Sequence, residues 1–540
     1  MKMADEQYTL SLLSPKGKYD YHELTDQTIN DLSIPFIAEQ VGKTKDERLI
    51  IYDVLKRMPI DPEVIRYRRD VYVDLKNQKG LGEQLLNIVK EMRFYTVGGF
   101  KKMDKDATVW DFISRLKELE NYCNSIIEIQ RLLQPCTFDS EGMKMVQEYV
   151  NGLCRDSGLK ELLEDVQSIT DEVANIKSLT IGVNLDTSLN PTEAGLISMN
   201  KAPYREQTIL ERFVQFHKKK GSQPQQLKPM SVLTHARNAF GDVSPLAENL
   251  TRLVETMIPQ VLNPLKAFVR KYVDVSGMML VSLFHELLFY VRFQEWEAKL
   301  KEFGLSCCVP EISADSTFLQ DFYNVKLAMV TMGEGQPNNI VTNELELNRE
   351  HRVLILTGPN RGGKTIFTQA IGLACLLAQH GLFVPCSGGK IQLCDGIYTH
   401  FPADENSTVT LGRLGEEAQR LSEICSAATA NSLLLFNESF SSTSHTESVY
   451  IAEDILRYLC CLGASTCYNT HMHELAEKAE QYGQREDAVC QAASLVMGSS
   501  EGNRDYKVRF AKSEGKSFAR EIAAQYGITF EQLYESKIHQ

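Results

Sequence analysis

The sequence predicts a mostly α-helical amino-terminal region that leads into a carboxy-terminal α/β domain. From about residue 22 to 177, apolar residues recur at every third or fourth position and prolines are few, which is typical of long helices. From about residue 320 onward, short β-rich runs alternate with helical stretches, which indicates an α/β domain. A glycine-rich turn over residues 358–365 separates one of these runs from a helical stretch. These three observations predict the fold class and the place of its functional site.

The composition indicates a large globular protein with an acidic balance of charge. The chain has 540 residues, of which 43% are hydrophobic, and its formal net charge is −13 at pH 7. This charge argues against a uniformly basic coat for nucleic acid, so any contact with DNA must be regional. The thirteen cysteines include no C-x-x-C pair, which predicts buried free thiols in a reducing compartment. No signal peptide and no uninterrupted apolar run of about 18 residues occurs, which predicts a cytoplasmic soluble protein.

The helical region divides into two predicted domains, residues 1–203 and residues 204–319. In the first, Asp61 can cap a helix that Pro62 opens, because proline at the first helical position loses no useful hydrogen bond. Residues 178–200 contain two short alternating runs around an Asn-Pro turn, which predicts a β-hairpin near the end of this domain. The second domain returns to a helical pattern.

The third predicted domain, residues 320–540, contains five β-rich runs with helical stretches between several of them. In chain order the runs read RVLILT, SLLLF, ASTCYNT, ASLVM and YKVRF. Residues 411–428 place leucine, alanine and cysteine side chains on one apolar stripe, which predicts an amphipathic helix in the same domain.

The glycine-rich turn fits a phosphate-binding loop in the context that such a loop requires. The strand-like VLILT precedes it and the helix-like IFTQAIGLACLLAQ follows it. Its eight residues are Gly358, Pro359, Asn360, Arg361, Gly362, Gly363, Lys364 and Thr365. The glycines let backbone N–H groups converge on phosphate oxygens, Lys364 neutralises the β- and γ-phosphates, and the Thr365 hydroxyl can bind Mg²⁺. The sequence therefore predicts a nucleotide-binding site here.

An acidic residue follows a buried run downstream of this turn. The run LLLF ends at Asn437 and Glu438, in the same predicted domain. Enzymes with this loop place a second strand that ends in an acidic residue beside the magnesium ion. We therefore predict that Glu438 polarises the attacking water, rather than being a polar residue that merely leaves a buried strand.

Four segments of the carboxy-terminal domain resemble the MutS family of DNA mismatch-repair ATPases. They occur in the order and with the spacing of that family, over roughly 120 residues, and read TGPNRGGKT, AQHGLFVPC, ATANSLLLFNESFSSTS and NTHMHEL. Upstream, MPIDPEVIRYRRDVYVDL is similar to the start of the family's helical core. The resemblance implies an α/β P-loop NTPase domain of the ABC-like kind, preceded by a mostly α-helical core and lever region.

The resemblance also implies a role for each matching residue. Residues 358–365 would hold the phosphates of ATP, Glu438 would be the catalytic carboxylate, and His471 would sense the γ-phosphate. Thr365 and Asn437 would face Mg²⁺. Because ATP sites in the family lie at a subunit interface, the resemblance implies a homodimer that binds DNA.

Two departures from the family pattern bear on this site. The family's strand ends in Asp-Glu, whereas here Asn437 precedes Glu438, and an amide brings no negative charge to the metal. We therefore expect weaker binding of Mg²⁺. The family's serine-led signature is replaced by GRLGEE, residues 412–417, so its hydroxyl is missing. Arg413 is either an alternative donor or a solvent-facing side chain.

Several features of the amino-terminal half bear on DNA recognition. The family's mismatch-reading domain has no expected counterpart, and we expect its DNA clamp to be reduced. The family's mismatch-reading domain inserts the phenylalanine of a Phe-x-Glu motif between bases. Phe293 begins such a motif here, but it lies in a helix-like stretch and is predicted to pack against apolar neighbours. The basic segment 217–229 is either a solvated loop or a phosphate contact.

Two functions remain open at this point. The first is a dimeric ATPase that hydrolyses ATP to control DNA binding, in mismatch repair or a related repair or recombination process. The second is a nucleotide-gated interaction protein with slow or no hydrolysis and no recognition of mismatches.

Overall fold

The computed structural model places the described residues in two compact units. The described residues are 10–97, 109–174, 177–188, 191–201, 259–275, 277–335, 340–359, 363–402, 412–440, 444–500 and 503–511, with Thr529 and Gln532. The helical unit contains the described parts of Asn87–Cys136 and Val146–Phe284. The sheet unit contains those of Thr9–Leu86, Thr137–Met145 and His285–Gln540. Within these ranges, no helix is long and apolar enough to cross a membrane.

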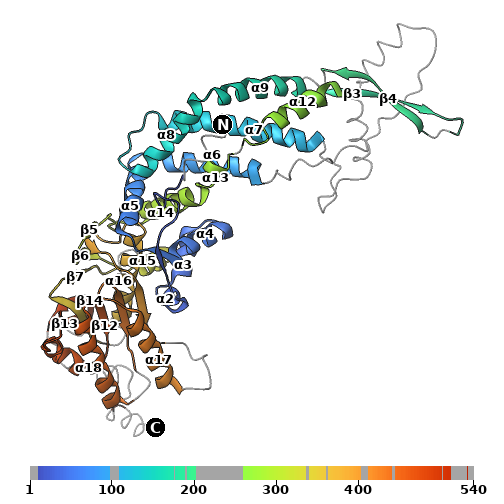
Figure 1. Ribbon diagram of the computed structural model, residues 1–540. Coiled ribbons are helices and arrows are strands. Elements are labelled where there is room, and N and C mark those ends of the chain that lie inside the picture. The colour runs from blue at the N-terminus through green and yellow to red at the C-terminus, as the bar shows by residue number, and fades with distance from the viewer. Residues whose placement is uncertain are drawn as a thin grey trace. The chain divides into compact units, whose positions relative to one another are not determined.

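The helical unit is built from long helices and one β-hairpin (Figure 1). Its elements include α7 (Val109–Leu133), α9 (Ser157–Ala174), β3 (Ser178–Leu185), β4 (Pro191–Asn200), α12 (Pro259–Lys271) and α13 (Met278–Val281), and it shares α6 (Leu81–Val97) and α8 (Glu141–Arg155) with the sheet unit. Strands β3 and β4 pair antiparallel, which confirms the predicted hairpin. Helix α12 packs against α7 and α9, and Lys271 Nζ lies 2.6 Å from Asp165 Oδ2 on α9. The basic segment 217–229 lies outside the described residues.

The sheet unit is organised around a six-stranded sheet with the order β10-β11-β12-β8-β13-β14. The first five strands are parallel, and β14 pairs antiparallel with β13. The strands are β8 (His351–Thr357), β10 (Ile397–His400), β11 (Leu433–Asn437), β12 (Ser465–Asn469), β13 (Gln491–Ser500) and β14 (Asn503–Phe510). The five predicted β-rich runs lie in β8, β11, β12, β13 and β14, which confirms the α/β class of this region.

Helices cover both faces of this sheet. They are α16 (Lys364–Gln379), α17 (Gly412–Ala427), α18 (His445–Leu462), α19 (His473–Glu477) and α20 (Ala479–Tyr482). Val353 and Phe436 belong to the core under α18 and α19, whereas Leu435, on the opposite face of β11, lies beside Gly372 of α16. Strands buried on both faces need apolar side chains at nearly every position, which explains the uninterrupted LLLF run. Leu421 of α17 is buried in the same core, which confirms the predicted amphipathic helix.

A smaller four-stranded sheet has the order β5-β9-β6-β7, and three of its strands precede the phosphate-binding loop in the chain whereas β9 follows it. Its strands are β5 (Glu311–Ser313), β6 (Thr317–Phe322), β7 (Asn343–Leu347) and β9 (Gly388–Gln392), and α15 (Val325–Gly333) follows β6. Gly389 has φ 146°, and a Cβ atom there would lie 2.1 Å from the carbonyl oxygen of Phe318. Only glycine allows β9 to approach β6 so closely.

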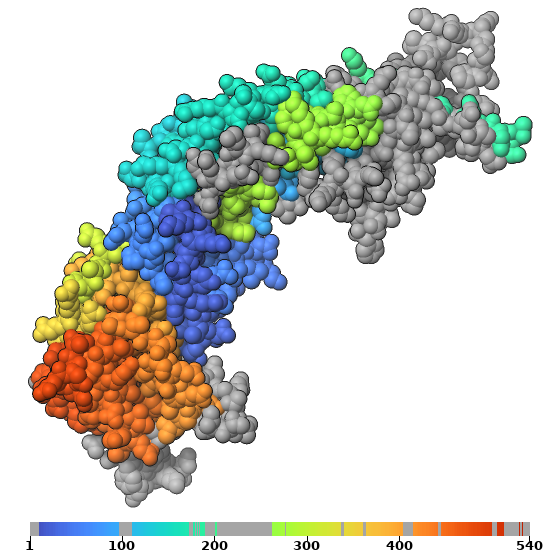
Figure 2. Space-filling model, viewed as in Figure 1, coloured from blue at the N-terminus to red at the C-terminus, as the bar shows by residue number. Residues whose placement is uncertain are grey.

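Amino-terminal elements of the sheet unit contact β10 of the central sheet and α16 on one of its faces. They are β1 (Tyr21–Glu23), α2 (Asp26–Asp31), α3 (Ile34–Val41), α4 (Lys45–Lys56), β2 (Arg57–Pro59) and α5 (Pro62–Asn77), joined by α14 (Phe284–Glu302). Gln369 Nε2 of α16 donates to the carbonyl of Asp31 at 2.6 Å, and Figure 2 shows this blue segment in direct contact with orange residues of the same unit. Asp61 Oδ1 accepts from the N–H of Glu63 at 2.8 Å, which confirms the predicted cap of α5.

Aromatic side chains of α14 form part of the core of this unit. Phe293 is 0% exposed and its ring centroid lies 5.0 Å from that of Phe289 and 5.7 Å from that of Trp296. The predicted packing role of Phe293 is therefore confirmed.

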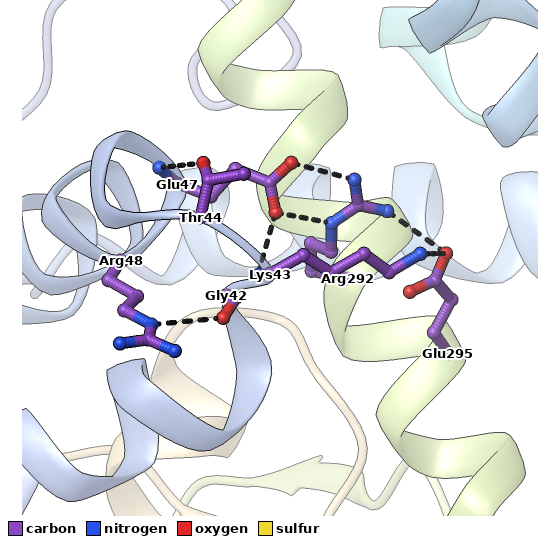
Figure 3. Close-up of polar contacts among 7 residues, drawn as sticks. All are labelled: Gly42, Lys43, Thr44, Glu47, Arg48, Arg292 and Glu295. Carbon is purple, nitrogen blue, oxygen red and sulfur yellow. Dashed lines mark hydrogen bonds and ion pairs between the residues drawn. The ribbon is translucent and has the colours of Figure 1, made fainter.

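A buried ion pair joins α4 to α14 (Figure 3). Arg292 Nε donates to Glu47 Oε2 at 2.8 Å, and Arg292 Nη2 donates to Glu47 Oε1 at 2.9 Å. Arg292 Nη1 also contacts Glu295, which accepts from Lys43 Nζ at 2.8 Å. The hydrogen bond from Arg292 holds the pKa of Glu47 below its ordinary value, against the effect of burial. A bidentate guanidinium–carboxylate pair of this kind fixes the orientation of the two helices.

Replacing Arg292 by methionine should lower the free energy of unfolding by about 3 kcal/mol, because Glu47 would be left buried without its partner. Arg457→Met is a matched control, since Arg457 is 42% exposed where it pairs with Glu453 on α18, and such pairs contribute about 0.5 kcal/mol. Urea titrations measure both values.

The effect of Arg292→Met should also depend on pH. Since the folded pKa of Glu47 is depressed, the stability from this pair is present above 4.5, its ordinary value, and is lost as the pH falls through the folded pKa. The difference in the free energy of unfolding between wild type and Arg292→Met should therefore become smaller below pH 4.5. If Arg292→Met and Arg457→Met lowered the free energy of unfolding equally at neutral pH, the stabilising role of the buried pair would be contradicted.

Candidate nucleotide site at the carboxyl edge of the sheet

Three neighbouring parallel strands end at the same edge of the central sheet. Strand β8 leads into Gly358, β11 leads into Glu438, and β12, which lies between β8 and β11, leads into His471. Backbone hydrogen bonds continue past the strand ends: the N–H of Thr470 donates to Leu356 O at 3.0 Å, and that of Glu438 donates to Asn469 O at 2.9 Å. The edge is therefore held in register up to the residues that the sequence predicted as functional.

Lys364 is the first residue of α16 and its side chain is buried, with 4% exposed. Its Nζ atom donates to the carbonyls of Gly358 and Pro359, both at 3.1 Å, and lies 3.4 Å from His471 Nδ1. Burial lowers the pKa of Lys364 to about 8, although the charge of Glu438 acts in the opposite direction. The ammonium group thus remains mainly protonated at neutral pH and lies directly beneath the turn.

The backbone of the turn explains two of its glycines. Gly358 has φ 147°, and a Cβ atom there would lie 2.7 Å from Met497 Cβ on β13. Gly363 has φ 96° and precedes the first residue of α16. Both conformations favour glycine, as does the close approach to Met497. The remaining predicted residues of the turn, Asn360, Arg361 and Gly362, lie outside the described residues.

Asn437 occupies the last position of β11 and is buried, with 6% exposed. Its Oδ1 atom accepts from the Thr365 hydroxyl at 3.0 Å and also from the Asn469 side-chain amide. Thr365 Oγ1 and Asn437 Oδ1 are therefore adjacent, as expected for two residues that face one ion. Both are hard, neutral oxygen donors of the type that Mg²⁺ accepts alongside phosphate oxygens and water.

Glu438 and His471 are in direct contact. His471 Nε2 lies 2.6 Å from Glu438 Oε1, and the two side chains are 38% and 32% exposed. The hydrogen bond from His471 lowers the pKa of Glu438, and burial opposes this effect. Glu438 has φ 52°, a left-handed conformation that a non-glycine residue rarely adopts. The structure thus places an ionised carboxylate and an imidazole beside Lys364.

A cleft of about 590 Å³ adjoins the turn, and the sequence analysis missed it. Its walls include Asn324, Val341, Asn343, Gly363, Ile366 and Tyr506. The volume lies within the range of about 300–1,000 Å³ that is typical of ligand pockets. Asn343 joins β7 to β14, because its Nδ2 donates to Tyr506 O at 3.2 Å and its Oδ1 accepts from the N–H of Val508 at 2.8 Å. No periodicity in the sequence signals this cleft, since its walls come from five separate segments.

The role predicted for Arg413 concerns the start of α17. Helix α17 begins at Gly412, but the side chain of Arg413 lies outside the described residues, so the role of Arg413 stays a prediction. Among the described residues, no group of three or more histidine, cysteine, aspartate or glutamate side chains is arranged to hold a metal ion. All thirteen cysteines are free, and seven of them are buried.

Comparison with known proteins assigns both halves of the chain to one group. The family model for MutS domain V matches residues 354–533, and the model for the MutS2 N-terminal domain matches residues 60–303. The chain belongs to the MutS family.

Individual relatives of this MutS-family chain support the same assignment. DNA mismatch repair protein MutS of Chlorobium phaeobacteroides is 34% identical over 181 residues, which are 33% of this chain and 20% of the relative. Endonuclease MutS2 of Caldicellulosiruptor bescii is 33% identical over 158 residues, 29% of this chain and 20% of the relative. DNA mismatch repair protein MutS of the same organism is 24% identical over 505 residues, 85% of this chain and 54% of the relative. This chain therefore spans between about a fifth and about half of the lengths of these relatives.

Proposed function

We propose that this protein binds and hydrolyses ATP at the carboxyl edge of its central sheet and uses the nucleotide to control DNA binding. The observation that carries the proposal is the convergence of Lys364, Thr365, Glu438 and His471 at the ends of three adjacent strands. A buried cation, two hard oxygen donors and an ionised carboxylate are the groups that phosphoryl transfer to water requires.

Each side chain has a separate task in this reaction. Lys364 places its charge on the β- and γ-phosphates, and Thr365 with Asn437 would hold Mg²⁺, which neutralises phosphate charge when bound. Glu438 orients a water molecule and accepts its proton, since its lowered pKa keeps it ionised at neutral pH. His471 contacts both Glu438 and Lys364 and is therefore suited to sense the γ-phosphate between them. The cleft beside Gly363 would take the nucleobase.

The fold is proposed to be that of an ABC-like P-loop NTPase, with the domain limits predicted from the sequence. The strand order supports this proposal, because β12 is inserted between the strand that leads to the turn and the strand that leads to Glu438. Residues 320–540 would form this domain, and residues 1–203 and 204–319 would form the helical core and lever regions.

The assignment to DNA repair or recombination rests on the relatives, which are named as mismatch repair proteins and an endonuclease. By the same analogy, we propose a homodimer with an ATP site in each subunit. Phosphate release measured with and without duplex, mismatched and branched DNA tests this part of the proposal. DNA should change the rate, and the effect should weaken steeply with salt because phosphate contacts release counterions. No binding to any of these DNAs at low salt would contradict it.

A nucleotide-gated interaction protein is the second candidate, and Asn437 favours it. An amide at the end of β11 supplies no negative charge to the metal, so ATP could be held while hydrolysis stays slow. Stoichiometric ATP binding without phosphate release above the background of a Glu438→Ala variant would support this candidate over the first.

Replacing Asn437 by aspartate should lower the Mg²⁺ concentration for half-maximal phosphate release by at least about fivefold. The new carboxylate can still accept hydrogen bonds from Thr365 and Asn469. At a distance of about 4 Å in water, its negative charge attracts each unit of positive charge on the metal ion by roughly 1 kcal/mol. Asn431→Asp is a matched control, because this exposed residue lies before the opposite end of β11. An unchanged Mg²⁺ requirement in Asn437→Asp would show that this position does not face the ion.

A further inference from the structure

His400 connects two elements that flank the candidate site. It is the last residue of β10 and is buried, with 2% exposed. Its Nε2 atom lies 3.2 Å from the backbone carbonyl of Glu417 on α17, and its Nδ1 atom lies 2.7 Å from the hydroxyl oxygen of Ser439. A carbonyl can only accept, so Nε2 carries the proton of the neutral ring and the bare Nδ1 accepts from the Ser439 hydroxyl.

The environment of His400 keeps its ring neutral. Burial, with a smaller contribution from the charge of Arg420, lowers the pKa of His400 to about 4. The ring also stacks on Phe440, with centroids 6.1 Å apart and planes inclined by 30°. The imidazole is therefore held in one orientation and one tautomer at physiological pH.

Ser439 lies in a turn whose backbone is strained on both sides of it. Glu438 has φ 52° and Phe440 has φ 64°. Left-handed backbone costs roughly 1–2 kcal/mol for each non-glycine residue, so such a turn persists only where its surroundings hold it. Two contacts hold its ends: the N–H of Glu438 donates to Asn469 O at 2.9 Å, and the Ser448 hydroxyl donates to Phe440 O at 2.7 Å. The hydrogen bond from the Ser439 hydroxyl to His400 holds the middle of the turn.

We propose that His400 is a positioning residue that fixes the direction of the Glu438 carboxylate through the Ser439 hydroxyl. This inference rests on the proposed function, in which Glu438 orients the attacking water. Ser439 is 3% exposed, so loss of the ring nitrogen removes the acceptor of a buried hydroxyl and releases the middle of the turn. The loss should be in the rate of the chemical step, because the residues proposed to bind the phosphates lie between β8 and α16 and at the start of α16, and not in this turn.

Two isosteric variants separate the two hydrogen bonds of the ring. The amide oxygen of asparagine at position 400 can reach the place of Nδ1 and accept from Ser439, but asparagine is too short to reach Glu417. Glutamine places its amide near Nε2 and so keeps the contact with Glu417 while losing the acceptor for Ser439. His400→Gln should therefore lower kcat by between about tenfold and a hundredfold, since misplacement by 1 Å has effects of this size. The kcat of His400→Asn should stay within about threefold of the wild-type value.

The experiment measures phosphate release at saturating ATP, the KM for ATP and the thermal unfolding temperature for wild type and both variants. KM should change little in either. Ser439→Ala should match His400→Gln in kcat, and the double variant should be no slower than either single one, because both remove the same bond. Three results would each overturn the inference. The first is a kcat in His400→Gln equal to that of wild type, and the second is an equal fall in kcat in His400→Asn and His400→Gln. The third is a fall in the kcat of the double variant that combines the effects of its two substitutions.

These outcomes are distinct from failure of the proposed function. If wild type releases phosphate no faster than Glu438→Ala, the proposed function and the role of His400 fall together. If wild type is clearly faster than Glu438→Ala while His400→Gln equals wild type, only the role of His400 is lost.

Discussion

Replacing Glu438 by alanine is expected to lower the rate of phosphate release by roughly two to four orders of magnitude, the contribution typical of a positioned general base. The reason lies in the geometry of the strand edge. Glu438 is held by contacts to β12 and to the residues just after it: its N–H donates to Asn469 O at 2.9 Å, and its carboxylate lies 2.6 Å from His471 Nε2. No water can be oriented by a methyl group at this place. ATP binding should be retained, because the residues that contact phosphate are unchanged.

Phosphate release under single-turnover conditions, with ATP affinity measured in parallel, tests this expectation. Glu477→Ala is the matched control, since Glu477 is an exposed carboxylate on α19 close to the same edge. It should leave the rate within about twofold of wild type. Equal rates in wild type and Glu438→Ala would remove the carboxylate from the chemistry.

The Lys364→Ala substitution should impair both binding and hydrolysis. Removing one preorganised donor to developing charge lowers kcat by about a hundredfold to a thousandfold. Loss of a charge-assisted hydrogen bond, about 1.5–3 kcal/mol, should also weaken ATP binding by tenfold or more. The effect is larger than for a surface lysine because Lys364 is 4% exposed and its Nζ atom lies within 3.1 Å of two carbonyls of the turn.

Equilibrium titration with a fluorescent ATP analogue, together with phosphate release, measures both effects. Lys390→Ala is a suitable control, because Lys390 is an exposed lysine on β9 of the same unit. Retention of ATP affinity in Lys364→Ala would show that the turn does not hold the phosphates. The pattern across variants is also diagnostic, since Glu438→Ala should lose hydrolysis alone.

Much of the fold follows from local sequence patterns. The apolar run before Asn437 predicts a buried strand, and the strand-turn-helix context around Lys364 predicts the start of α16. Helix caps such as Asp61 are equally local, since they depend on residues two or three positions apart. These features were predictable because hydrophobic periodicity and turn chemistry act over a few residues.

Other features depend on contacts between distant parts of the chain and could not be predicted. His400 approaches Ser439 only because β10 lies beside β11 in the sheet, and nothing near His400 in the sequence signals this. Likewise, Gln369 of α16 meets Asp31 across a sequence separation of 338 residues. The cleft beside Gly363 combines residues of β6, α15, β7, α16, β13 and β14, and its lining residues have no common pattern.

A crystal structure of this protein with Mg²⁺ and a non-hydrolysable ATP analogue tests the central claim most directly. The account predicts a triphosphate in the turn, with its β- and γ-phosphates within hydrogen-bonding distance of Lys364 Nζ and a water molecule between the γ-phosphate and the Glu438 carboxylate. An analogue bound elsewhere, or a Glu438 side chain directed away from the terminal phosphate, would contradict it.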